Sequence, residues 1–146
     1  MYQYKQSGMA NVWLANGYVR VAGEDAEQAQ VESIQGLDRE IARILFLSDA
    51  VLTGRAVRFL RLQLGLNRPE LGAMIGVGAE SIIQWEQEVT VIPVAADFMI
   101  RTLYISKIQP NLTVEALLAM LKKVDRSKRY RLMCHWAGQA WQVHEA

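Results

Sequence analysis

The fold of this chain is decided by residues 65–86, which read GLNRPELGAMIGVGAESIIQWE. Asn67 can cap a helix over 68–75, and the proline in the first turn of that helix costs no backbone hydrogen bond. Gly76 then permits the positive φ at which helices often end. Apolar residues return at a helical spacing over 79–87. The stretch therefore predicts two short helices joined by a tight turn.

Helical patterns continue on both sides of this stretch. Upstream, Thr53 is placed to cap one helix, and an earlier segment repeats apolar residues near a 3.6-residue period. Downstream, Pro93 opens a long helix and Pro110 separates it from a last one. We therefore predict a mainly helical domain over 37–125 with its core at 53–107. The expected helices cover 37–47, 53–64, 68–75, 79–87, 93–107 and 113–123.

Both ends of the chain have the alternation of short strands. Asn16-Gly17 is a strong hairpin signal, and it predicts a turn between strands at 12–14 and 18–21. Residues 129–136 and 141–143 predict a second hairpin at the carboxyl end. Because a few short strands alone are only marginally stable, the two antiparallel pairs should pack on each other. The predicted divisions are 1–36, a hairpin or extended region; 37–125, the helical domain; and 126–146, a hairpin tail on the first strands.

Composition limits the classes of protein to consider. The 146 residues, 51% hydrophobic and 21% charged, suffice for one good core. No apolar run approaches the ~18 residues of a membrane span, and the amino terminus lacks the order of a signal peptide. Cys134 is the single cysteine, so a disulfide within the chain and a cysteine-based zinc finger are both excluded. These features favour a cytoplasmic protein with no metal and no cofactor.

The net charge of +1 is unevenly distributed along the chain. Residues 1–52 carry four basic and seven acidic side chains, whereas residues 110–146 carry six and three. A local basic surface matters more for binding nucleic acid than the total charge does. The basic cluster at 122–131 can equally be a solvated helix end and linker.

Several short segments around the deciding stretch share one pattern. They are Leu60-Arg61, Gly65-Leu66-Asn67, LGAMIGV at 71–77, AESIIQWE at 79–86, and Pro93. Together they resemble the lambda-repressor-like, or XRE, helix-turn-helix family over residues 53–107. The resemblance implies a five-helix domain preceded by one extra helix. It also implies a homodimer that places helix 79–87 in the major groove of double-stranded DNA.

The resemblance assigns a DNA-facing surface to the second helix of the motif. Gln84 can read adenine, Ser81 can bind a phosphate or a base, Ile83 can touch a thymine methyl group and Glu80 can accept from cytosine. The expected DNA-binding residues on this helix are Ala79, Glu80, Ser81, Ile83, Gln84 and Gln87.

Phosphate contacts must come from elsewhere, because helix 79–87 carries no arginine or lysine. Arg68 is the best candidate, since it lies at a helix amino terminus. Three residues depart from the family pattern: Ile83 stands where a small polar residue is common, Arg68 replaces a common glutamine, and Glu88 replaces a glycine. The further candidates for phosphate contacts are Arg55, Arg58, Arg101, Lys122 and Lys123.

The resemblance also suggests that Arg61 and Glu86 meet as a partly buried ion pair between two helices. The alternative is that they are two unrelated surface charges. If they pair, their role is structural and they read no bases. A further alternative is a retained fold whose role on DNA has been lost.

The flanks resemble proteins related to MqsA-type antitoxins. The matching residues are Tyr2, Tyr4, Ser7, Gly8, Asn11, Val12 and Leu14, followed by GLDR at 36–39. Such proteins join an amino-terminal zinc-binding domain to this kind of helix-turn-helix. The Cys-x-x-Cys pairs of that domain are absent here, so metal binding does not carry over.

These patterns lead to one main hypothesis and one alternative. The main hypothesis is a sequence-specific DNA-binding transcriptional regulator, a homodimeric repressor. The alternative is a protein-interaction module, antitoxin-like or an adaptor, which binds a toxin or another protein through an aromatic sheet and binds DNA weakly. An enzyme is not expected, because adjacent strand residues such as Cys134 and His135 point to opposite faces and no other nucleophile–base set is visible.

Overall fold

The computed structural model describes residues 1–21, 29–120 and 130–146. The chain divides into two compact units, and each is described by itself. The terminal unit combines residues 1–44 and 130–146, and the helical unit spans 45–129. Their boundary falls within helix α1 (Ile34–Leu47). The expectation of a mainly helical chain is corrected to a mixture of helices and strands, with short strands at both termini.

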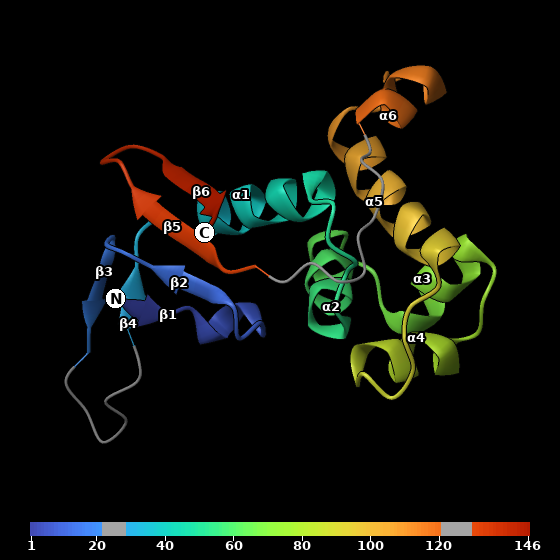
Figure 1. Ribbon diagram of the computed structural model, residues 1–146, viewed down its shortest axis with the longest axis horizontal. Helices are drawn as coiled ribbons and strands as arrows, with labels where there is room; N and C mark the ends of the chain where they lie inside the picture. The colour runs from blue at the N-terminus through green and yellow to red at the C-terminus, as the bar shows by residue number, and fades with distance from the viewer. Residues whose placement is uncertain (22–28, 121–129) are drawn as a thin grey trace. The chain divides into compact units, whose positions relative to one another are not determined.

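The terminal unit contains two separate sheets (Figure 1). Four strands form one sheet in the order β1-β2-β5-β6, and the other two form an antiparallel pair, β3-β4. Strands β2 and β5 run parallel, whereas β1–β2 and β5–β6 are antiparallel. The elements are β1 (Tyr2–Gln3), a 3-10 helix (Lys5–Ser7), β2 (Val12–Leu14), β3 (Tyr18–Arg20), β4 (Ala29–Val31), β5 (Leu132–Trp136) and β6 (Trp141–Glu145).

The hairpin predicted at Asn16-Gly17 is wrong, because β2 and β3 lie in different sheets. Gly17 does take a positive φ of 75°. However, the Asn16 side chain bonds both backbone groups of Trp136, accepting from its N–H at 2.6 Å and donating to its C=O at 2.8 Å. This contact holds the turn against the end of β5 instead of folding β3 back on β2. The predicted carboxyl-terminal hairpin is present as β5–β6.

Packing in the terminal unit places one polar pair among apolar side chains. Tyr4, Val12, Leu14 and Leu132 are fully buried. The Tyr4 hydroxyl donates a 3.0 Å hydrogen bond to Asp38 Oδ1, which lies on α1. Burial, together with the Asp38 carboxylate, raises the pKa of Tyr4, and burial raises the pKa of Asp38 although the Tyr4 hydroxyl opposes that shift.

The raised pKa of Asp38 predicts a pH-dependent loss of stability. The folded state holds the proton of Asp38 more tightly than the unfolded state does. The stabilisation from this proton is therefore complete below the ordinary pKa of 3.8, and it is lost as the pH rises through the raised pKa of the folded state. Asp38→Asn never ionises and keeps an acceptor for Tyr4. Urea unfolding at several pH values should show Asp38→Asn gaining stability over the wild type as pH rises through this window. A pH-independent difference contradicts this expectation.

The helical unit has the caps that the sequence predicts. Thr53 accepts from the Ala56 N–H at 3.1 Å, and Asn67 forms a reciprocal capping box with Glu70. None of the described helices combines the length and apolar character needed to cross a membrane. The continuation predicted for the last helix, to residue 123, lies outside the described residues. The helices are α2 (Gly54–Gln63), α3 (Arg68–Ile75), α4 (Ala79–Glu86), α5 (Val94–Ile108) and α6 (Val114–Met120).

Arg101, expected to contact phosphate, is instead a buried structural residue with 2% of its surface exposed. Its Nε donates to Asp97 Oδ1 at 2.6 Å, and its Nη atoms donate to the carbonyls of Leu45, Phe46, Ser48 and Ala50. These bonds satisfy the last carbonyls of α1 and the connector to α2. Asp97 Oδ2 also accepts from the Leu52 N–H at 2.7 Å. The periodicity of α5 did not reveal this, because an arginine on a helix is usually a surface residue.

Candidate nucleic-acid interface

Helices α3 and α4 are joined by a turn of three residues, Gly76, Val77 and Gly78, and pack closely on each other (Figure 1). Gly76 ends α3 with a φ of 81°, and the Gly76 and Val77 N–H groups both donate to the Gly72 carbonyl. A Cβ on Gly72 would lie 2.5 Å from the Val77 carbonyl oxygen, so no larger residue fits without movement. Glycine at these positions sets the angle between the two helices.

The predicted ion pair between Arg61 and Glu86 is present and nearly inaccessible to water. Arg61 Nε donates to Glu86 Oε2 at 2.7 Å and Nη2 donates to Oε1 at 3.0 Å, with side-chain exposures of 8% and 2%. Arg61 Nη1 also donates to the Leu66 carbonyl at 3.0 Å. The pair therefore fixes α4 to α2 and to the α2–α3 connector. Bidentate geometry of this kind is specific to arginine.

Arg68 adds a third member to this cluster, which the sequence did not predict. Its Nε donates to Glu86 Oε1 at 3.3 Å, and 40% of its side chain remains exposed. The Glu86 carboxylate thus contacts an arginine from α2 and another from the start of α3. Part of the Arg68 charge is neutralised, although its exposed part remains available to a phosphate.

Neutralising Glu86 should destabilise the helical unit. Glu86→Gln leaves the Arg61 charge buried without its counter-ion, which costs about 3 kcal/mol in free energy of unfolding. Urea denaturation followed by circular dichroism measures this loss. The control Glu80→Gln lies on the exposed side of the same helix and should change stability by less than ~0.5 kcal/mol. Equal stabilities of the two variants would show that the ion pair is dispensable.

The outward surface of α4 is mostly polar and at least partly accessible. The buried side of this helix consists of Ile82, Trp85 and Glu86, of which Ile82 is fully buried. The six residues predicted to face DNA all lie outside that buried set. Gln84 Nε2 makes a long contact of 3.4 Å with Glu80 Oε1, so its amide is only weakly held. Ala79, Ser81, Ile83 and Gln84 are half-buried, and Glu80 and Gln87 are exposed.

Arginine side chains in the helical unit divide into structural and free groups. Arg61 and Arg101 are buried in ion pairs. Arg55 and Arg58 are exposed on α2, and within the described part of the chain no hydrogen bond or ion pair engages either of them. The two are three residues apart and therefore share one side of α2. Lys122 and Lys123 lie outside the described residues.

Two further features lie where the start of α2 meets the end of α4. A Cβ on Gly54, the first residue of α2, would lie 2.9 Å from the Glu86 carbonyl oxygen, so the backbones approach closely here. The family resemblance expects glycine at position 88. Glu88 has a φ of 60°, in the left-handed region that glycine adopts readily and that residues with a side chain rarely adopt. Gly54 directly follows the Thr53 cap in the sequence, and this glycine was the signal from which the close approach of the two backbones could have been predicted.

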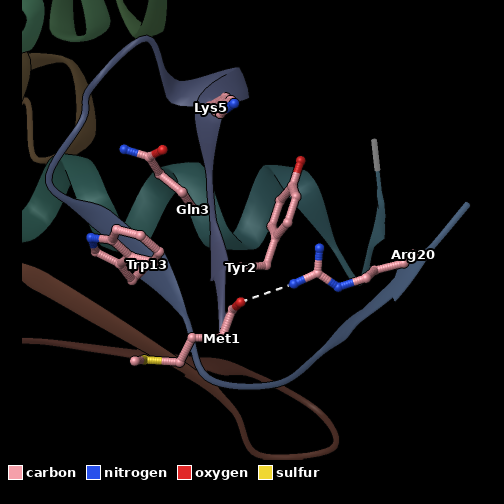
Figure 2. A pocket seen from close by; sticks show the side chains of 6 residues that line it. All are labelled: Met1, Tyr2, Gln3, Lys5, Trp13 and Arg20. Atoms are coloured by element: carbon pink, nitrogen blue, oxygen red, sulfur yellow. Dashed lines mark hydrogen bonds between the residues drawn. The ribbon is translucent and has the colours of Figure 1, made fainter. Parts of the chain in front are cut away.

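A second surface of interest is an open groove of about 210 Å³ in the terminal unit (Figure 2). It is lined by aromatic and polar side chains of the first strands. The Arg20 guanidinium lies 5.9 and 5.8 Å from the ring centres of Tyr2 and Tyr18, and its Nη2 donates to the Met1 carbonyl at 3.1 Å. Among the described residues, no carboxylate lines this groove. Its lining is Met1, Tyr2, Gln3, Lys5, Trp13 and Arg20.

Cys134 and His135 point to opposite faces of β5, as the strand alternation predicts. Cys134 is fully buried, and burial raises the pKa of its thiol to about 12. His135 is exposed and stacks on His144 with ring centres 5.7 Å apart. A thiol with this pKa is a poor nucleophile at neutral pH. Within the described ranges, no three residues among His, Cys, Asp and Glu gather as metal ligands.

Comparison of the chain with family models, with curated proteins and with solved structures finds no match. What the chain binds must therefore be inferred from its own residues and their geometry.

Proposed function

We propose that this protein is a sequence-specific DNA-binding transcriptional regulator of the lambda-repressor-like kind, a homodimeric repressor in the cytoplasm. In this proposal α3 and α4 form the helix-turn-helix, and α4 enters the major groove. The observation that carries it is the outward side of α4, which is at least partly accessible and mostly polar, while the Arg61–Glu86 pair fixes its inner side. A reading helix needs such rigid support because its side chains must match base edges closely.

In this proposal the predicted contacts divide into base reading by α4 and phosphate binding by arginines. Gln84 reads adenine with its amide, and Ser81 binds a phosphate or a base edge. Arg55 and Arg58 supply the main phosphate contacts, since their charges are exposed and uncompensated among the described residues. Arg68 contributes less than the sequence alone indicated, because Glu86 shares its charge. With few phosphate contacts per chain, useful affinity requires two chains on two half-sites.

Fluorescence anisotropy with DNA from immediately upstream of the protein's own coding region tests this function. The titration is repeated with a scrambled duplex of the same composition and at two salt concentrations. A preference of about 100-fold or more for the upstream duplex, with a clear salt dependence, is expected for a regulator. Equal and weak binding to both duplexes would contradict sequence-specific recognition by α4.

Substitutions should separate base reading from phosphate contacts. Gln84→Ala should weaken binding to the upstream duplex by ~1–3 kcal/mol and leave binding to the scrambled duplex unchanged. The double variant Arg55→Ala and Arg58→Ala should weaken both and reduce the magnitude of the salt slope by about two per chain. Arg43→Ala removes an exposed arginine of α1 and serves as the control. A uniform effect of all these variants would refute the assignment.

The alternative function is a protein-interaction module, and the groove in Figure 2 favours it over any other second candidate. Aromatic residues with arginine are typical of the centres of protein interfaces. Trp13→Ala should then abolish binding to the protein partner while leaving DNA binding intact. Trp13 lies in the terminal unit, so this variant does not alter the contacts that support α4.

A further inference from the structure

The four-stranded sheet of the terminal unit has two unlike faces, which follow from its register. Side chains alternate between the faces along each strand, and residues paired across strands share a face. One row across the sheet consists of the buried residues Tyr2, Leu14, Cys134 and Val143. The next row lies on the opposite face, and its half-buried or exposed members are Gln3, Trp13, Met133 and His144. We call this second face the outer face.

Rings and a thioether occupy the outer face, where the solvated side of a sheet usually carries polar side chains. Trp13 lies half-buried on β2, and Met133 lies beside it on β5; these are the two central strands. His135 shares the face of Met133, because the two are two residues apart on one strand. His135 and His144 are exposed, and their rings stack with centres 5.7 Å apart and an interplanar angle of 12°. The outer face therefore offers several flat surfaces to a ligand.

Two arginines bring positive charge to these flat surfaces. The guanidinium of Arg131, an exposed residue just before β5, lies 5.7 Å from the centre of the Trp13 ring. Arg20 and Trp13 both line the groove in Figure 2, so the groove continues the outer face at the β1 side of the sheet. Glu145 is the single acidic residue of the four strands, and it pairs with the buried Leu132 on the opposite face. The strands therefore add no negative charge to the outer face.

We propose that the outer face binds single-stranded nucleic acid, with bases stacking on Trp13 and phosphates contacting Arg131 and Arg20. His135 and His144 extend the stacking surface across β5 and β6. Accessible rings beside cations suit this ligand, because every base has a flat face and every nucleotide carries a phosphate. This inference goes beyond the proposed function, since it concerns single strands and the terminal unit, whereas α4 would read a duplex.

Two other ligands match only part of this surface. A duplex stacks its bases on one another, so it presents phosphates to the arginines but no base face to Trp13. An acidic peptide also matches the arginines, and it leaves the rings without a flat partner. A single strand uses both features at once, because its unstacked bases can lie on aromatic rings and on guanidinium planes while its backbone contacts the cations.

Fluorescence anisotropy of the full chain with labelled oligo(dT) and oligo(U) of about 12 nucleotides tests this binding without any substitution. Binding of either strand supports the proposal, and the tighter of the two identifies the preferred sugar. An abasic strand of the same length and charge should bind at least ~5-fold more weakly, because it has no bases to stack. Absence of binding, equal affinity for the abasic strand, or equally effective competition by polyglutamate would overturn the proposal.

Substitutions in the outer face separate stacking from charge. Trp13→Ala should weaken oligo(dT) binding by about 5-fold or more, whereas Trp13→Phe keeps a ring and should lose less. Arg131→Ala should reduce the magnitude of the salt slope by about 0.7, the value for one phosphate of a single strand. Gln139→Ala, in the exposed β5–β6 turn, is the control and should bind as the wild type does. Unchanged affinity of Trp13→Ala would overturn the proposal.

If Trp13→Ala fails to fold, which circular dichroism detects, the double variant His135→Ala and His144→Ala replaces it. Both residues are exposed, so the variant keeps the buried face of the sheet intact. It should bind oligo(dT) more weakly and the upstream duplex as the wild type does. Gln84→Ala should show the reverse, so failure of the outer face and failure of α4 are observed separately. Undiminished oligo(dT) binding by the histidine variant, or loss of it in Gln84→Ala, would overturn the proposal.

Discussion

The Glu86 carboxylate is the interaction on which the helical unit depends. It accepts two hydrogen bonds from Arg61 of α2 and one from Arg68 at the start of α3, while its own helix is α4. A charge with 2% side-chain exposure is tolerable only when it is paired in good geometry. One acidic side chain thus connects three helices. Its position on the inner side of α4 leaves the outer side free for recognition.

Most of the basic side chains in the described part of the helical unit make structural contacts. Arg61 and Arg101 are buried, and Lys107 donates to the Gln63 and Leu64 carbonyls at the end of α2. Under the proposed function, Arg55 and Arg58, with the exposed part of Arg68, are the described cations left for phosphate contacts. Under the proposed function, so few free cations among the described residues of one chain favour binding by a pair of chains.

The terminal unit is built from both ends of the chain. Its sheet joins strands from both ends of the chain, with β2 parallel to β5. Side-chain contacts satisfy the turn at Asn16, and Arg20 protects the edge at β1.

The sequence by itself determined the features that are local. Helix spans and the Thr53 and Asn67 caps depend on residues within one or two turns, and periodicity predicted them correctly. The family resemblance also suggested Arg61 with Glu86, although not the third member Arg68. The tertiary structure alone decided which strands pair and which arginines are buried. Asn16-Gly17 turns toward β5, and Arg101 caps α1, because both depend on segments more than 50 residues away, whose approach is set by packing of the whole unit.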